Sequence, residues 1–347
     1  MRARSELRVL VATAAFLCSG CSGGQGTGGD ADGQPGDGAG SGGDAETGGD
    51  LTTVGDIDYQ TDPALLDLHG ACPLDVRLGG FKVEANQDVG YTAVDGIVRD
   101  GVVPSQVPQE ALVEGDCKLL RRRRLVCDPV CETSQTCGFD ESCIPMPLGQ
   151  DMGVATFRGL VKLVTIGPIQ PGNAYFYSRL THPGFTVDQV VQLTTTPGYL
   201  GALELYGVGV AQLLPSESSW VITEGAPLTL HWAPPGPGSR SRVYTEINID
   251  QHGVTPLNLV CDFPDTGEGT ISQGLIDGLV QAGVTGFPSG KATRRTADSM
   301  TAAEGCVEFL VTSVRQAAVE VSGHTPCTSD ANCQEPLHCN LLVQQCE

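Results

Sequence analysis

The sequence predicts a mainly β protein: an antiparallel β-sandwich-like domain, preceded by a small disulfide-stapled β region and followed by a short C-terminal cysteine-rich unit. Two observations predict this fold class. Apolar and polar residues alternate in runs that Gly and Pro separate, and many of the 14 cysteines fall in two short clusters. Alternation with a period of two is typical of half-buried strands, and a cluster too short to enclose a core needs covalent staples.

Most of the alternating runs lie in residues 151–323, which we expect to form the sandwich-like domain. Apolar residues alternate with polar ones at 228–232, 243–250 and 307–312. An earlier run at 81–85 predicts a strand in the small β region. Runs of this kind between Gly and Pro turns favour an antiparallel sandwich or barrel.

One helix is expected within the sandwich-like domain, in the sequence QGLIDGLVQAG. Ser272 precedes it and is a suitable N-cap residue. Leu275, Ile276 and Leu279 fall on one side of such a helix, so we expect this face to be buried.

The first 20 residues have the features of an export signal. A stretch with three arginines precedes nine apolar or small residues at 9–17, which are too few to cross a bilayer as a helix. The following Ser19-Gly20-Cys21 resembles the lipobox of bacterial lipoproteins, which implies cleavage before Cys21 and lipidation of its thiol, with palmitate among the acyl chains. An ordinary cleaved signal peptide, with Cys21 incidental, is the alternative.

The next segment, residues 21–54, consists largely of Gly, Asp, Ser, Ala and Thr. Such a composition cannot form a packed core, so we expect a flexible acidic tether. The whole chain has a formal net charge of −21. This charge disfavours nucleic acid as a partner and suits a solvated, exported protein whose contact with the membrane is made through lipid chains.

Cysteine arithmetic supports an oxidising compartment. If Cys18 leaves with the signal peptide and Cys21 carries lipid, 12 cysteines remain, which fits six disulfides. Two four-cysteine units contain eight of them: Cys127, Cys131, Cys137 and Cys143, then Cys327, Cys333, Cys339 and Cys346. In each unit we favour pairing of the first with the third and the second with the fourth. Pairs Cys72–Cys117 and Cys261–Cys306 are then expected. The Cys-x2-Cys pairs of zinc sites are absent from both units, so no metal is expected.

These observations divide the chain into six segments: a lipoprotein signal peptide (1–20), a tether (21–54), a small β region (55–126), a cysteine-rich unit (127–150), the β-sandwich-like domain (151–323) and a C-terminal cysteine-rich unit (324–347).

The chain resembles cysteine-rich lipoproteins of the myxobacterial type. The likeness rests on the lipobox, the Gly-rich tether, the sequences CDPVC, PLTLHWAP and LVCDFPDTG, and the terminal CTSDANC. It implies export and lipid anchorage at the bacterial outer membrane or cell surface. It implies no catalytic residue and no cofactor.

Catalytic motifs are sparse. Asp265-Thr266-Gly267 matches the triplet of aspartic proteases, which need two carboxylates sharing a proton. It occurs once, so we interpret it as an acidic turn after the strand that contains Cys261. None of the six histidines forms a His-Glu-x-x-His motif, and there is no Gly-x-Ser-x-Gly. We expect His231 to be an outward-facing strand residue.

Two further features are candidates for binding. Tyr175 and Tyr177 would lie side by side on a strand, where they could contact a ligand or pack in the core. The basic run Arg121–Arg124 could contact an acidic glycan, lipid head groups or the tether, or it could be a solvated strand edge.

Two hypotheses for function follow. The leading one is a non-enzymatic binding or structural role at the envelope, with an envelope glycan or a surface protein as partner. The alternative is a secreted hydrolase with a site near Asp262 and Asp265.

Overall fold

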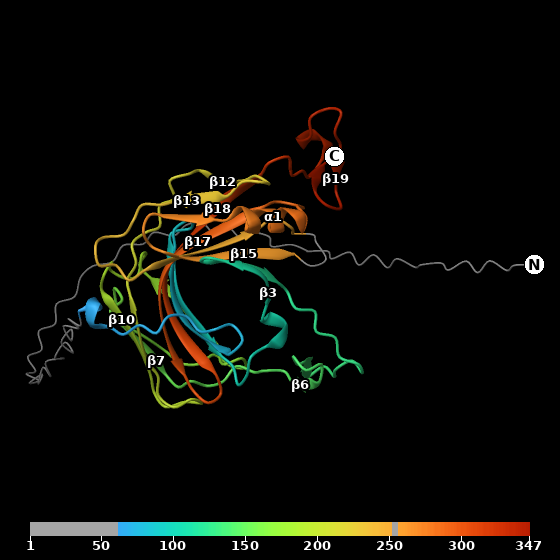
Figure 1. The fold of residues 1–347 in the computed structure, drawn as a ribbon. Coiled ribbons are helices and arrows are strands. Elements are labelled where there is room, and N and C mark those ends of the chain that lie inside the picture. The colour runs from blue at the N-terminus through green and yellow to red at the C-terminus, as the bar shows by residue number, and fades with distance from the viewer. Residues whose placement is uncertain (1–61, 252–255) are drawn as a thin grey trace, which may run out of the picture. The chain divides into compact units, whose positions relative to one another are not determined.

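The computed structural model describes residues 62–251 and 256–347, and they form a mainly β structure (Figure 1). In this part of the chain the strands form one sheet of ten strands, one of four, and three two-stranded ribbons. The predicted mainly β, sandwich-like fold is confirmed. The predicted signal peptide, the lipidation residue Cys21 and the tether lie outside the described residues.

The ten-stranded sheet, which we call the large sheet, combines strands from both ends of the chain. Its main path has β3 at one edge and β9 at the other, while β12 pairs with β18 beside that path. In spatial order the strands are β3 (Gln109–Glu114), β4 (Cys117–Arg121), β15 (Leu257–Pro264), β14 (Arg242–Asn248), β17 (Ser289–Thr301), β18 (Cys306–Val321), β1 (Arg77–Asn86), β2 (Tyr91–Val98) and β9 (Tyr175–Leu180), with β12 (Ser219–Ile222).

The smaller elements cover parts of this sheet or lie in its connections. The four-stranded sheet contains β11 (Glu204–Val208), β10 (Val190–Thr195), β7 (Ala155–Arg158) and β8 (Val164–Ile166). The ribbons are β13 (Leu228–His231) with β16 (Glu268–Ile271), β5 (Gln135–Cys137) with β6 (Cys143–Pro145), and β19 (Cys339–Asn340) with β20 (Gln345–Cys346). The helices of the described residues are α1 (Gln273–Gln281) and the short 3₁₀ turns η1 (Pro63–Leu65), η2 (Pro104–Gln106) and η3 (Asp330–Asn332).

Two hydrophobic cores lie on one face of the large sheet. The first lies between the large sheet and the four-stranded sheet, where Phe81 and Phe309 meet Phe157 and Leu193. The second lies under the β13–β16 ribbon and α1. Figure 1 shows α1 beside β15. Because strand side chains alternate in direction, the opposite face of the large sheet carries the intervening residues.

The predicted helix is confirmed as α1. The Ser272 hydroxyl accepts a hydrogen bond from the Leu275 backbone N–H at 3.4 Å, as expected of an N-cap. Leu275, Ile276 and Leu279 are buried in the second core. The amphipathic pattern therefore identified both the helix and the face that packs.

The large sheet is mixed rather than purely antiparallel. Strand β18 pairs antiparallel with β17, but its other edge pairs in parallel with β1 and then with β12. A strand of 16 residues is long enough for two shorter strands to share one edge. Strands expected in the small β region (55–126) thus join the same sheet as those expected in 151–323, and the described residues form one compact unit.

All 12 cysteines from Cys72 onward form disulfides. The expected pairing within both four-cysteine units is confirmed. The expected pairs Cys72–Cys117 and Cys261–Cys306 are wrong, because the bonds are Cys72–Cys306 and Cys117–Cys261. Sheet topology explains the difference: Cys117 on β4 is the register partner of Cys261 on β15. Cys306 begins β18, beside the segment that leads into β1.

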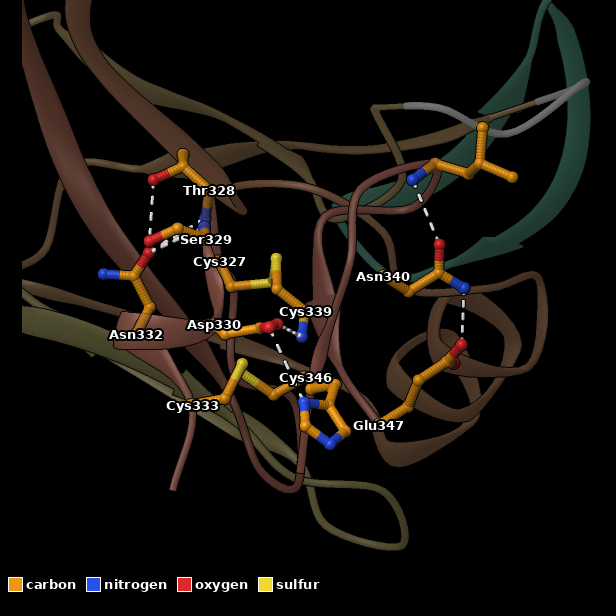
Figure 2. Close-up of a disulfide and its surroundings, with 12 residues drawn as sticks. Cys327, Thr328, Ser329, Asp330, Asn332, Cys333, Cys339, Asn340, Cys346 and Glu347 are labelled. Carbon is orange, nitrogen blue, oxygen red and sulfur yellow. Dashed lines mark hydrogen bonds and ion pairs between the residues drawn. A yellow bond between two sulfur atoms is a disulfide. The ribbon is translucent and has the colours of Figure 1, made fainter. Parts of the chain in front are cut away.

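The C-terminal cysteine-rich unit is held by disulfides and by polar side chains that bond to its own backbone (Figure 2). Asp330 accepts a hydrogen bond from the Cys339 N–H at 2.7 Å. The Asn332 side chain accepts from the N–H groups of Thr328 and Ser329 at 3.0 and 3.2 Å. Such bonds replace the missing core in a unit of this size.

Candidate functional site

The face of the large sheet opposite the two cores carries paired charges, and we call it the polar face. Arg77 pairs with Glu308 at 3.0 Å, and Lys82 with Glu84 at 2.8 Å. Farther along the sheet, Lys291 of β17 pairs with Glu246 of β14. Alternation along each strand places these side chains on one face and the core residues on the other.

A groove of about 250 Å³ lies on this face over β1, β2 and β18. Five charged residues line it: Arg77, Lys82, Asp95, Arg99 and Glu308. Its apolar lining includes Leu74, Ile97, Val102 and Leu310. A concave, partly apolar surface with a few convergent charges is the usual form of a small-ligand site.

One wall of the groove is fixed by a disulfide and a buried carboxylate. The Cys72–Cys306 bond ties the segment before β1 to the start of β18. Glu308, 6% exposed, accepts from the Cys72 N–H and from Arg77 Nη1, both at 3.0 Å. These contacts hold Arg77 at the groove before any ligand arrives.

The opposite wall follows β2 and contains η2. The Arg99 N–H donates to Leu78 O at 2.9 Å, which extends the pairing between β2 and β1. Asp100 then accepts from the Leu148 N–H at 2.8 Å and from Gln150 Nε2 at 2.9 Å. The end of the first cysteine-rich unit therefore braces this wall.

The floor of the groove requires glycine where β1 has a bulge. Gly79 has φ = 127°, a conformation that residues with a side chain rarely adopt. A Cβ atom at this position would lie 2.1 Å from the Ile97 carbonyl oxygen. The bulge is also where the register between β1 and β18 shifts, between Arg77 and Gly79.

Burial changes the acid–base properties of the groove. Burial raises the pKa of Asp95, and the charge of Lys82 offsets part of that effect. Burial lowers the pKa of Lys82, but its hydrogen bond to Glu84 and the charge of Asp95 outweigh burial, so the net pKa is raised. Lys82 is thus held as a cation by its carboxylate neighbours.

Arg99 differs from the other cations of the groove. Arg77 and Lys82 each have a carboxylate partner. Among residues 62–251 and 256–347, the guanidinium of Arg99 has no hydrogen-bond or ion-pair partner. Arg99 therefore offers the groove a set of donors that no acceptor of the described residues uses.

The structure assigns Asp265 to the interior. Its Oδ1 accepts from Trp232 Nε1 at 2.8 Å and Arg294 Nη2 at 3.0 Å. Its Oδ2 accepts from Ser241 Oγ at 2.6 Å and Arg294 Nε at 2.7 Å. The Asp265 and Arg294 side chains are 2% and 1% exposed, so this carboxylate is fully occupied. The triplet beginning at Asp265 forms the turn between β15 and β16, as expected.

Asp262 lies on the other side of the sheet from Asp265. It pairs with Arg242 Nε and Arg295 Nη2, each at 3.1 Å. Arg294 and Arg295 are consecutive on β17 and point to opposite faces, and each binds one of the two carboxylates. Asp262 and Asp265 therefore cannot share a proton as an aspartic protease pair does.

Tyr175 is a core residue rather than a ligand contact. It is 1% exposed, and its ring packs edge-on against Phe81 with centroids 5.0 Å apart. Its hydroxyl donates to Gly153 O at 2.8 Å and accepts from the Met152 N–H at 2.9 Å. Tyr177 is half-buried, with Lys162 Nζ 5.0 Å from its ring centroid. Of the two roles considered for Tyr175, ligand contact is therefore wrong and packing in the core is right, because its side chain faces inward.

The basic run and His231 occupy exposed positions. Arg121 ends β4, and the run continues in an irregular segment where Arg122 is exposed and Arg123 lies over the Phe139 ring at 5.3 Å. His231 is half-exposed on β13, and its Nδ1 lies 2.5 Å from Glu217 Oε1. His231 is thus an outward strand residue, as expected.

Sequence patterns did not single out three residues that the fold makes prominent: Arg99, Arg294 and Asp298. Asp298 is 3% exposed on β17, where it accepts from the backbone N–H groups of His69 and Tyr206. The available signal for Asp298 was a charged residue within a strand pattern. Its partners His69 and Tyr206 could be identified only from the sheet topology.

The sulfur atoms of the cysteine-rich units do not form a metal site. Three sulfurs of each unit lie close together, those of Cys127, Cys131 and Cys143 in the first. All are bonded in disulfides, and a metal ion binds the thiolate form of cysteine.

Comparison with known proteins assigns this chain to no family. No protein-family model and no curated protein matches the chain. Among solved structures, the chain is similar to the chicken CNTN1 FN1–FN3 domains, with 9% identity over 64% of this chain and 71% of that one. The TM-score is 0.17, which is too low to relate the two folds.

Proposed function

We propose that this chain is a lipid-anchored lipoprotein of the bacterial envelope, of the cysteine-rich myxobacterial type, with a non-enzymatic binding role at the outer membrane or cell surface. The observation that carries the binding role is the groove beside Arg99. Its walls are fixed by a disulfide and by backbone hydrogen bonds, and one of its cations has no partner among the described residues. Preorganised walls lower the cost of binding.

The disulfides support export. Six disulfides in the described residues fit an oxidising compartment such as the periplasm or the cell surface. Among the described residues, no helix combines the length and apolar character needed to cross a membrane.

The hydrolase alternative near Asp262 and Asp265 has weaker support. Each carboxylate is bound by arginine, and the two lie on opposite faces of the sheet. A general acid or nucleophile must reach a substrate, whereas Asp265 is 2% exposed.

The anchor is tested by metabolic labelling with a fatty-acid analogue in a bacterial host that processes lipoproteins. Wild type and the Cys18→Ala control should take up the label, whereas Cys21→Ala should not. Label retained in Cys21→Ala would refute the lipid anchor at this residue.

The binding role is tested with immobilised, purified full-length protein exposed to two envelope fractions, one of glycans and one of proteins. Leu310→Trp should fill the groove and remove retention of the bound fraction. Val221→Trp, at a 50% exposed position on β12, is the matched control and should bind as wild type does. Equal retention by both variants would exclude the groove as the binding site.

A further inference from the structure

We propose that the groove binds a small monoanionic carboxylate with an apolar body. Its carboxylate is held by Arg99, and its carbon chain lies along Ile97 and Leu310. This inference rests on the binding role proposed above and names the ligand class of the same groove.

The choice of an anion follows from the unpartnered cation. Arg77 and Lys82 lie 3.0 and 2.8 Å from the carboxylates that neutralise them. Arg99 has no such partner among the described residues, although it lines the same groove. The planar guanidinium matches a carboxylate with two parallel N–H···O bonds, a geometry that lysine cannot provide.

The pairing of charges around the groove selects a single negative charge. Glu308 pairs with Arg77, and Glu84 and Asp95 both contact Lys82, so Arg99 is the lining cation that has no carboxylate partner among the described residues. A monoanion would supply that partner. A dianion would keep a second negative charge near two carboxylates, and the net charge of −21 of the chain adds to that repulsion.

The apolar lining and the volume select the body of the ligand. Ile97 lies on the same face of β2 as Asp95 and Arg99, and Leu310 faces it from β18 across Gly80 and Lys82 of β1. The volume of about 250 Å³ is below the roughly 300 to 1,000 Å³ of pockets for drug-sized ligands. A carboxylate with a short hydrocarbon chain fits these dimensions.

Two sources supply this chemistry: a free carboxylic acid and the C-terminal carboxylate of a peptide. The experiment uses purified full-length protein, followed by NMR or calorimetry, with hexanoate, hexanamide and hexylamine as probes. A second set of probes consists of short peptides ending in leucine, with a free or an amidated C-terminus. Tighter binding of the free peptide than of hexanoate would identify a peptide C-terminus as the source, and the reverse order would identify a free carboxylic acid. Either result supports a carboxylate site.

We expect hexanoate to bind at least about tenfold more tightly than hexanamide or hexylamine, because a charge-assisted bond is lost with the neutral probe. Arg99→Gln should weaken hexanoate binding by a similar factor. Arg122→Gln, at an exposed position in the basic run, is the matched control and should leave it unchanged. Each added methylene should strengthen binding by up to about fourfold until the groove is full.

The variants separate this inference from the proposed binding role. If Leu310→Trp removes binding while Arg99→Gln leaves the affinity unchanged, the groove binds a ligand but the carboxylate assignment is wrong. Equal binding of amide and acid, or of amidated and free peptide, also overturns the assignment. If neither variant changes binding, the groove is not the site. Unchanged thermal unfolding of Arg99→Gln serves as the folding control.

Discussion

Asp265 and Arg294 form a bidentate ion pair inside the protein, with Nε–Oδ2 and Nη2–Oδ1 distances of 2.7 and 3.0 Å. Arg294 also donates to the carbonyl oxygens of Gln212 at 3.1 Å and Ala233 at 2.6 Å. The pair connects β17 to the turn after β15, to the segment between β11 and β12 that contains Gln212, and to the segment after β13 that contains Ala233. Both carboxylate oxygens of Asp265 and the Nε, Nη1 and Nη2 atoms of Arg294 have hydrogen-bond partners, which is the condition for charges to be tolerated in an interior.

Replacing Asp265 by Asn should therefore destabilise the fold strongly. Removing one partner of a buried pair leaves the other charge uncompensated, at a cost of about 3 to 5 kcal/mol. Asp262→Asn is the matched control, because Asp262 is 39% exposed and its pairs contribute at most about 1 kcal/mol each. Urea unfolding monitored by circular dichroism measures both. A midpoint for Asp265→Asn equal to that of wild type would contradict the structural role of this pair.

The sequence was sufficient to predict the turn that contains Asp265 but not to predict that Arg294 binds its carboxylate. The triplet after β15 was correctly expected to be a turn, since Gly267 and the preceding strand are local features. Arg294 is 29 residues away and lies in a strand of polar and small residues, SGKATRRTADSMT. Which of its two consecutive arginines faces inward depends on the register with β14, which periodicity alone did not specify.

The same dependence on long-range strand pairing explains which disulfides could be predicted from the sequence. Pairing within each four-cysteine unit was predictable, because bonds 10 to 13 residues apart are local. The pairs Cys72–Cys306 and Cys117–Cys261 are 234 and 144 residues apart, and they follow from strand order. The groove depends on the parallel pairing of β1 with β18, another long-range contact that no short motif encodes.

Peptide mapping of the unreduced protein by mass spectrometry should recover Cys72–Cys306 and Cys117–Cys261. In the chain-entropy description, bonds with these separations stabilise by about 5 kcal/mol each, against about 3 kcal/mol for a bond within a cysteine-rich unit. We therefore expect Cys72→Ser/Cys306→Ser to lower the unfolding midpoint more than Cys127→Ser/Cys137→Ser does. Recovery of a Cys72–Cys117 peptide would contradict the described sheet.

His69 should titrate above the ordinary histidine value. Its hydrogen bond to Asp298, with Nδ1 3.0 Å from Oδ1, raises its pKa above 6.5, and the charge of Asp298 adds to the effect. A raised pKa in the folded state means that the contact stabilises fully below the unfolded pKa and is lost as pH rises through the folded pKa. The contact between His69 and Asp298 of β17 should therefore weaken as the pH rises through this raised pKa.

NMR titration of the imidazole protons measures this pKa directly. In Asp298→Asn the pKa should return toward 6.5, whereas Asp67→Asn should change it only slightly, since the Asp67 charge is the smallest of the causes. A His69 pKa at or below 6.5 in the wild type would rule out the contact with Asp298.

Finally, the hydroxyl of Tyr175 should contribute to stability rather than to binding. Tyr175→Phe removes the group that accepts from the buried Met152 N–H and donates to Gly153 O. Leaving a buried donor unpaired costs about 1 to 3 kcal/mol. Tyr177→Phe, two residues along the same strand, keeps the ring beneath Lys162 and should change the unfolding free energy by less than about 0.5 kcal/mol. Chemical denaturation separates the two variants, and equal unfolding free energies would show that the Tyr175 hydroxyl does not join β9 to the segment at 152–153.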